Sequence, residues 1–213
     1  EGTAMSQYAF YFDGTRCTGC KTCVYACKDK YDLDLGMAYR KVREYGGGET
    51  AKNDNGSFTT TCFDYPVSVS CNHCDEPACF SKCPQGAIVK DSDTGFVEVD
   101  DEKCIGCGTC VIVCPYEAPK VDEEQKKARK CTACKEIVAG GEKPVCVMAC
   151  PARALDFGTV DELQKKYPDA ERANIAPLPA ASETTPNLFI KPAVDAKPWD
   201  DKSGELANPL EVK

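Results

Sequence analysis

Alternating apolar and polar residues predict only a few short strands along this chain. The segments YAFYF (8–12), FTTTC with YPVSVS (58–70) and FVEVD (96–100) have the period of two that is typical of strands. VDELQKKY (160–167) has the spacing of a short helix, with Asp161 near its start. REYGGGETAKNDNGS (43–57) reads as a turn-rich excursion. The pattern therefore predicts an α+β fold with long loops and few elements from which to build a core.

The C-terminal segment from Asn174 onward combines proline with isolated apolar residues. It holds six prolines in forty residues, and Leu188, Phe189, Ile190 and Trp199 interrupt its polar stretches. One interpretation is a disordered tail. The other is an extended arm that binds a partner through these apolar residues, and their presence favours the arm.

Composition narrows the classes of function. The chain has 213 residues, 17 cysteines and a net charge of −8. An odd cysteine count without an apolar signal segment argues against a disulfide scaffold. The negative charge argues against nucleic acid as a partner. No apolar run is long enough for direct membrane insertion. Met5 is interpreted as the natural start, with residues 1–4 a remnant of processing or cloning.

Sixteen of the cysteines fall into four groups, and Cys62 is left over. In the second group the middle gap is four residues, and in the fourth it is eleven. Groups two, three and four end in Cys-Pro, whereas group one ends in Cys27-Lys28. The groups are Cys17, Cys20, Cys23, Cys27; Cys71, Cys74, Cys79, Cys83; Cys104, Cys107, Cys110, Cys114; and Cys131, Cys134, Cys146, Cys150.

This spacing is the C-x2-C-x2-C-x3-C-P run of bacterial ferredoxins. Three closely spaced thiolates let a loop wrap three corners of an iron–sulfur cube, while loop amides point at the sulfurs. Cys27 follows Cys23 by four residues, so a helix starting there would place them one turn apart. The fourth cysteine can then bind the other cluster of a pair.

Residues 66–119 hold groups two and three and form a complete two-cluster ferredoxin. Groups one and four must then pair across it, so the sequence predicts two ferredoxin-like modules, the second inserted into the first. The split module is 5–65 with 120–158, and 159–213 is a short helix with an extended partner-binding tail. The four [4Fe-4S] clusters are assigned to Cys17, Cys20, Cys23, Cys150; Cys131, Cys134, Cys146, Cys27; Cys71, Cys74, Cys79, Cys114; and Cys104, Cys107, Cys110, Cys83.

Other interpretations of single residues are weaker. Structural zinc would fit group four alone, because it leaves no role for a third close cysteine. A single histidine, His73, cannot make a Rieske site, so His73 is expected to pack or to donate near a cluster. Cys62 lies in a strand pattern and is expected to be a buried free thiol. Arg129, Lys130 and Lys135 either raise the potential of a nearby cluster or are solvated.

The chain resembles the four-cluster iron–sulfur subunits of molybdopterin oxidoreductases, most closely those of dimethyl sulfoxide reductases. The matching stretches are CTGCKTC, SCNHCDEPAC, CPQGAI, CIGC, CPYEAP, EKPVCVMACPARALDFG, APLP and LANP, which lie between about residues 8 and 212. The resemblance implies the split pairing given above. It also implies the order Cys17, Cys131, Cys71 and Cys104 along a path of single-electron transfer, with no catalytic residue in this chain.

The resemblance also implies partners. A molybdopterin-containing catalytic subunit would face the Cys17 cluster, and a quinol-linked membrane anchor or an external donor would face the Cys104 cluster. The expected location is peripheral at the cytoplasmic membrane, after co-export with the catalytic partner; the alternative is the cytoplasm. The rival function is a free-standing soluble polyferredoxin that shuttles electrons, which would have no need of the forty-residue arm.

Overall fold

The first sheet combines a strand from near the N-terminus with strands from the last third of the chain. In the computed structural model, which describes residues 6–212, β1 (Tyr8–Asp13) lies between β10 (Leu155–Thr159), antiparallel to it, and β12 (Leu188–Lys191), parallel to it. β11 (Glu171–Arg172) extends the sheet beyond β12. The predicted strand 8–12 is thus confirmed, and it is buried on both faces. The interpretation of Met5 lies outside the described residues.

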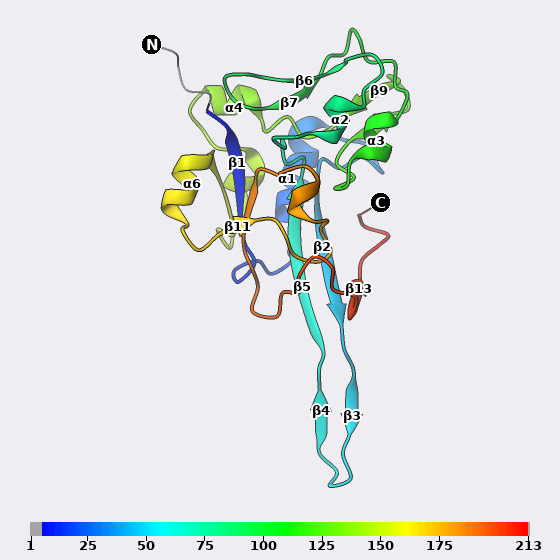
Figure 1. The fold of residues 1–213 in the computed structure, drawn as a ribbon, viewed down its shortest axis with the longest axis vertical. Coiled ribbons are helices and arrows are strands. Elements are labelled where there is room, and N and C mark those ends of the chain that lie inside the picture. Colours follow the sequence, from blue (N-terminus) through cyan, green and yellow to red (C-terminus); the bar gives the residue numbers. More distant parts are fainter. Residues whose placement is uncertain (1–5, 213) are drawn as a thin grey trace.

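The second sheet carries a long projecting arm. β2 (Arg40–Gly47) pairs antiparallel with β5 (Phe63–Ser70), and β13 (Gly204–Leu206) pairs with the other edge of β2. The two long strands continue into the hairpin of β3 (Thr50–Lys52) and β4 (Phe58–Thr60), which projects from the body (Figure 1). The segment predicted as a turn-rich excursion is therefore largely β-hairpin.

Glycine is required where the arm joins the sheet. Gly48 has φ +88°, and a Cβ on it would lie 2.3 Å from the carbonyl oxygen of Thr61. A side chain is excluded at this position by both the backbone conformation and the space. The arm also overturns one prediction, because Cys62 lies in it, between β4 and β5, and is exposed rather than buried. The neighbouring strands β3 and β4 are exposed along their whole length, so an alternating pattern here does not bury one face.

The remaining elements are short and surround the cysteine groups. Two small antiparallel hairpins are β6 with β7 and β8 with β9, and β7 confirms the strand expected at FVEVD. Their bounds and those of the helices are β6 Ile88–Lys90, β7 Val97–Val99, β8 Lys120–Asp122, β9 Lys127–Arg129, α1 Thr22–Tyr31, α2 Ala78–Ser81, α3 Thr109–Val113, α4 Lys135–Ala139, α5 Val145–Met148 and the 3-10 helix η1 Ala181–Glu183.

The predicted helix at 160–167 is α6 (Val160–Lys166). Its first turn is closed by a capping box, in which Glu162 N–H donates to the Thr159 hydroxyl and Thr159 N–H donates to the Glu162 carboxylate. This motif satisfies two free amides at once. Among residues 6–212, no helix is long and apolar enough to span a membrane.

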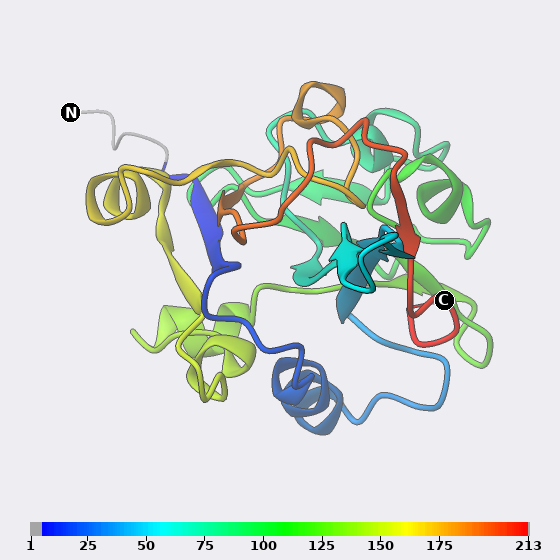
Figure 2. The ribbon, with the colours of Figure 1, turned by 90° about the horizontal axis from the view of Figure 1, so that it is seen from below.

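The C-terminal segment is built into the body instead of hanging free. Leu188, Phe189 and Ile190 form the buried part of β12 beside β1, while Trp199 stays 44% exposed. In Figure 2 the orange to red chain runs from β12, next to blue β1, across to β13 at the second sheet. The interpretation of this segment as a disordered tail is therefore wrong.

Asp156 in β10 is a buried charge held by several donors. Its carboxylate accepts hydrogen bonds from the Lys143 ammonium, from Lys166 Nζ at 2.7 Å and from the Tyr167 hydroxyl at 2.7 Å. Burial alone would raise the pKa of Asp156, but these hydrogen bonds outweigh it and hold the pKa well below its usual range. The carboxylate thereby joins α6 to the first sheet.

Asp156→Asn is expected to lower the free energy of unfolding by about 2 kcal/mol, because it removes charge-assisted hydrogen bonds. That corresponds to a melting temperature lower by roughly 4–8 °C. Because the native pKa is depressed, this stabilisation is complete above the unfolded carboxyl pKa of about 3.9 and is lost as the pH falls through the native pKa. Thermal melts should therefore show the same penalty at pH 6 and pH 8. Asp54→Asn at the exposed hairpin tip is the neutral control, and a penalty that changes between pH 6 and 8 would contradict the assignment.

Candidate iron–sulfur centres

Each cysteine group ends in a short helix that separates its last two sulfurs. Cys23 and Cys27 both lie on α1, four residues apart, as the sequence predicted. Cys79 is on α2, Cys110 on α3 and Cys146 on α5, and each group's last cysteine follows four residues later. Four residues are about one helical turn, so Cys23 and Cys27 on α1 lie one turn apart and can serve neighbouring sites, whereas in the other groups the last cysteine lies just beyond the end of the helix.

Three cavities are each lined by four cysteines from two different groups. Cys150 of group four completes the first cavity, Cys114 of group three the second, and Cys83 of group two the third. The remaining walls are mostly apolar, with Phe12 and Leu155 at the first. The cysteine sets are Cys17, Cys20, Cys23, Cys150; Cys71, Cys74, Cys79, Cys114; and Cys83, Cys104, Cys107, Cys110.

The other four cysteines surround one another deeper in the molecule. Burial raises the pKa of the Cys27 thiol, the charges of Cys131, Cys146 and Cys134 raise it further, and that of Arg40 lowers it. The same pattern recurs at the cavities, where burial raises the pKa of Cys74 to about 12 and its cysteine neighbours add to the effect. Four thiols therefore meet in each of four places.

The four sets form a row, because single cysteines of adjacent sets approach one another. Electrostatic effects link the sets: Cys23 of the Cys17 set raises the pKa of Cys146, Cys71 raises that of Cys131, and Cys110 raises that of Cys79. The order from one end to the other is thus the Cys17, Cys131, Cys71 and Cys104 sets.

The two ends of this row reach the surface. Cys20 in the first set and Cys107 in the last are exposed, whereas the cysteines of the two middle sets are buried or partly buried. Thr22 and Thr109, each two residues after the exposed cysteine, place their hydroxyls 3.4 and 3.3 Å from its sulfur. These hydrogen bonds lower the pKa of both thiols. The ends thus expose one stabilised sulfur each.

Backbone amides point at the sulfurs in a repeated motif. In CPQGA and CPARA, the alanine N–H donates to the cysteine sulfur four residues earlier, from Ala87 to Cys83 and from Ala154 to Cys150, both at 3.3 Å. In CPYEA, burial raises the pKa of Cys114, and a hydrogen bond from Ala118 N–H opposes that rise. Sequence reasoning missed these alanines as functional positions, although the repeated C-P-x-x-A was there to be read.

Buried polar atoms without protein partners test whether the second cavity fits a cluster. The Asn72 amide nitrogen, the Tyr116 hydroxyl and the Thr184 hydroxyl are all buried and have no hydrogen-bond partner among residues 6–212, and all three residues line this one cavity. Buried donors almost always have partners in native proteins. Sulfur atoms of a cluster inside the cavity would accept these hydrogen bonds, so the residues present fit a [4Fe-4S] group.

Comparison with known proteins agrees with this donor set. A family model described as a 4Fe-4S binding domain matches residues 15–37, and one described as a 4Fe-4S dicluster domain matches residues 63–160. Together these ranges contain all sixteen grouped cysteines and exclude Cys62. The two matches describe clusters of the kind that the spacing predicted.

Relatives that match nearly the whole chain identify the family to which it belongs. The B polypeptide of anaerobic dimethyl sulfoxide reductase from Escherichia coli (strain K12) is 50% identical over 97% of this chain and 99% of the relative. The protein of the same name from Haemophilus influenzae is 50% identical over 98% of this chain and 100% of the relative. This protein belongs to the family of dimethyl sulfoxide reductase B polypeptides. It is an iron–sulfur electron-transfer subunit, not the catalytic one, as the sequence predicted.

More distant members of this wider group carry related names. The thiosulfate reductase electron transfer subunit PhsB of Salmonella typhi is 39% identical over 74% of this chain and 78% of the relative. The B polypeptide of sulfite dehydrogenase from Allochromatium vinosum is 36% identical over 89% of this chain and 82% of the relative. Iron–sulfur subunits alike in sequence are thus named for different reactions.

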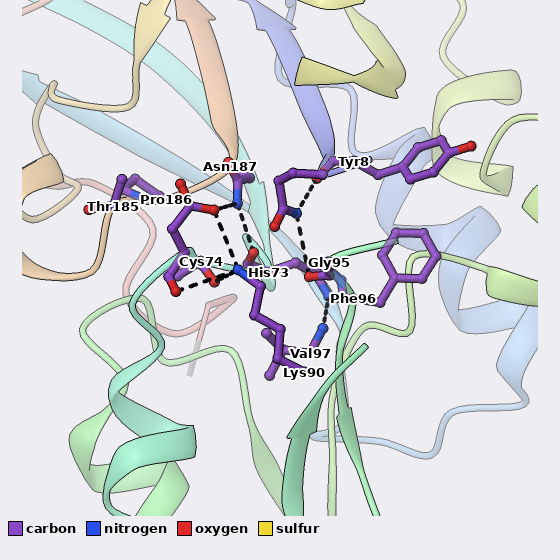
Figure 3. A network of polar contacts seen from close by, with 12 residues as sticks. Tyr8, His73, Cys74, Lys90, Gly95, Phe96, Val97, Thr185, Pro186 and Asn187 are labelled. Atoms are coloured by element: carbon purple, nitrogen blue, oxygen red, sulfur yellow. Dashed lines mark hydrogen bonds and ion pairs between the residues drawn. The ribbon is translucent and has the colours of Figure 1, made fainter. Parts of the chain in front are cut away.

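His73 in this electron-transfer subunit is a buried packing residue. Its Nδ1 accepts a hydrogen bond from Val97 N–H at 2.9 Å, and its ring lies 5.4 Å from that of Phe96. The Asn187 amide donates to the His73 carbonyl at 2.9 Å, while Lys90 donates to the Cys74 carbonyl at 2.9 Å (Figure 3). The C-terminal segment therefore helps to fix the Cys71–Cys74 loop.

The basic residues around Cys131 divide into two kinds. Arg129 and Lys135 form ion pairs with Asp101 and Glu98 and reach solvent. Lys130 is 4% exposed, and its ammonium donates to backbone carbonyls, including that of Cys131 at 3.2 Å. Of the two interpretations left open by the sequence, solvation therefore applies to Arg129 and Lys135. Lys130 instead has a buried ammonium beside the cysteines.

Lys28 explains why group one lacks the usual proline. It lies on α1, which continues to Tyr31, and its ammonium donates to the carbonyls of Asp34 and Met37, both at 2.7 Å. A proline directly after Cys27 would remove a helical amide and clash with the preceding turn. Lysine instead keeps the helix intact and secures the loop that follows it.

Proposed function

We propose that this chain relays single electrons through four [4Fe-4S] clusters. The observation that carries the proposal is the meeting of four cysteines in each of four places, every set drawn from two sequence groups. The ligand sets would be Cys17, Cys20, Cys23, Cys150; Cys27, Cys131, Cys134, Cys146; Cys71, Cys74, Cys79, Cys114; and Cys83, Cys104, Cys107, Cys110. The arrangement corresponds to two ferredoxin-like modules, 66–119 inserted between 5–65 and 120–158.

A [4Fe-4S] cluster accepts and returns one electron without making or breaking a substrate bond. The protein's own part in such a relay is to hold the clusters in place and to set their reduction potentials. Cysteine thiolates would bind the iron, apolar walls such as Phe12 and Leu155 exclude water, and amides such as those of Ala87 and Ala154 stabilise the sulfurs. The row of adjacent sets gives the electron a path from Cys20 to Cys107.

The exposed ends of this path are where partners would dock. We assign the Cys20 end to a molybdopterin-containing catalytic subunit and the Cys107 end to a membrane anchor or an external donor, by analogy with the relatives' place in reductase complexes. The chain would then be peripheral at the cytoplasmic membrane, carried there by its partners. The segment 159–213, which is folded onto the body, would contribute its exposed residues, such as Trp199, to a partner surface.

Anaerobic native purification followed by metal analysis tests this proposal. A large second chain that co-purifies with molybdenum or tungsten, together with about sixteen irons on this chain, four per cluster, is the expected result. A lone chain with the same iron content and no second metal would overturn the subunit assignment and leave a soluble shuttle. A colourless chain without iron would overturn the clusters themselves.

A further inference from the structure

Arg40, the first residue of β2, is a buried cation without a carboxylate. It is 1% exposed, and among residues 6–212 no Asp or Glu forms an ion pair with it. Its guanidinium lies over the ring of Phe10, 4.7 Å from the centroid. A buried charge without an opposite charge is costly, so its place in the fold calls for a compensating negative group.

Two serines on the neighbouring strand hold the guanidinium in place. Arg40 Nη1 donates to Ser68 Oγ at 3.1 Å, and Nη2 donates to Ser70 Oγ at 3.0 Å. β2 and β5 are in register here, with Arg40 opposite Ser70. The Nε–H donor is also buried and has no hydrogen-bond partner among residues 6–212. The side chain is therefore fixed but incompletely satisfied.

The guanidinium lies between two cysteine sets. Its charge interacts most strongly with Cys146 and then with Cys23 of the Cys17 set, followed by Cys131 and Cys27, which belong to the same set as Cys146. These sets are the adjacent pair at the Cys20 end of the row. The negative groups that would compensate Arg40 are thus the thiolates of two different sites.

Ser68 extends the contact toward the first set. A serine hydroxyl has one proton, and because its oxygen accepts from Arg40, that proton is free for another acceptor. The Cys23 sulfur lies 3.4 Å from Ser68 Oγ. Arg40 therefore reaches Cys23 through a single hydroxyl and acts on Cys146 through its charge.

We propose that Arg40 is a positioning residue that raises the midpoint potentials of both the Cys17 and the Cys131 clusters. The inference rests on the proposed function, because it needs both clusters to be present. A cluster that takes one electron from its neighbour gains one negative charge, and no proton or bond changes. A fixed positive charge in a medium of low dielectric stabilises that reduced form.

Redox titration of the intact complex, followed by electron paramagnetic resonance, tests this role. In Arg40→Gln, the potentials of both clusters should fall by at least a tenfold change in the reduced-to-oxidised ratio, about 59 mV for one electron. Arg40→Lys keeps the charge and should recover much of the shift. Arg43→Gln is the matched control, because Arg43 is buried on the same strand but is paired with Glu117 at 2.9 Å, so it should leave both potentials in place.

Ser68→Ala provides a second, milder variant. It removes the hydroxyl between Arg40 and Cys23 and one of the two serine contacts of the guanidinium, while Ser70 still holds the other side, so the potential of the Cys17 cluster should fall by more than that of the Cys131 cluster. If both variants contain full iron and their cluster potentials are unchanged, the proposed role of Arg40 is overturned. The four-cluster proposal itself would not be affected by that result. If Arg40→Gln fails to assemble, Ser68→Ala decides alone. Missing clusters in the unsubstituted chain would instead overturn the proposed function.

Discussion

Cys146→Ser is expected to stop electron flow through the subunit while leaving its fold largely in place. Cys146 is buried in the second set and also lies near Cys23 of the first set. Losing its thiolate should cost the cluster that the second set holds, so iron should fall by about four per chain. The first set would then be cut off from the other two, and turnover of the complex with its natural electron donor should fall to background.

Cys62→Ser is the matched control for this experiment. It makes the same chemical change at the exposed cysteine of the hairpin arm, outside every set. Iron content and turnover should remain at the level of the unsubstituted complex. A small artificial reductant that supplies the catalytic subunit directly should also keep the Cys146→Ser complex active. Full turnover of Cys146→Ser with the natural donor would contradict the relay.

Removal of iron is expected to unfold most of the chain. The helices are four to ten residues long, too short to be stable alone in water. Several members of the largest buried cluster are cysteines, including Cys23, Cys27, Cys131 and Cys146. Structural zinc binds small peptides with apparent free energies of about 10–16 kcal/mol, comparable to the usual stability of a domain, about 5–15 kcal/mol, so bound metal can supply most of the stability of a fold.

Near-ultraviolet circular dichroism and limited proteolysis, before and after anaerobic chelation, measure this dependence. The aromatic signal should be lost when iron is removed. The protease should cut the projecting hairpin in both the iron-loaded and the iron-free chain, but it should cut residues 66–158 only in the iron-free chain. Refolding should require iron and sulfide together. An iron-free chain that retains its aromatic signal and its protease resistance would show that the sheets alone stabilise the fold.

The cysteine pattern was predictable because it is local. Spacings of two and three residues fix loop and helix-turn geometry within one segment, and the step from Cys23 to Cys27 along α1 follows directly from the period of a helix. Once 66–119 is recognised as self-contained, only one pairing of the other two groups remains. The sets that meet in the structure are the same ones, and their role as ligands is the proposal tested above.

Long-range packing was the part that sequence could not supply. Nothing about an arginine after Tyr39 indicates that two serines nearly thirty residues later will enclose it between cysteine sets. The C-terminal segment looked like a partner-binding arm because Leu188, Phe189 and Ile190 need burial, but the pattern does not say against what. β1 satisfies that need within the same chain. A segment folded in this way would suit a shuttle as well, so it discriminates less between the two functions than the sequence suggested.

The hairpin arm shows the opposite failure. The alternating pattern at 58–70 correctly predicted strands, yet Cys62 is exposed. Alternation of apolar and polar residues predicts an extended backbone, but burial also requires other residues to pack against the strand. The repeated C-P-x-x-A was visible in the sequence, but its meaning depends on where the alanine amides point.

Anaerobic reductive titration of the purified complex, with iron and sulfide counted on the same sample, tests the central claim most directly. A relay of four clusters predicts about sixteen irons and sixteen sulfides on this chain and four one-electron steps that belong to it. Eight irons with two such steps would contradict it, since only one of the two modules would then carry clusters.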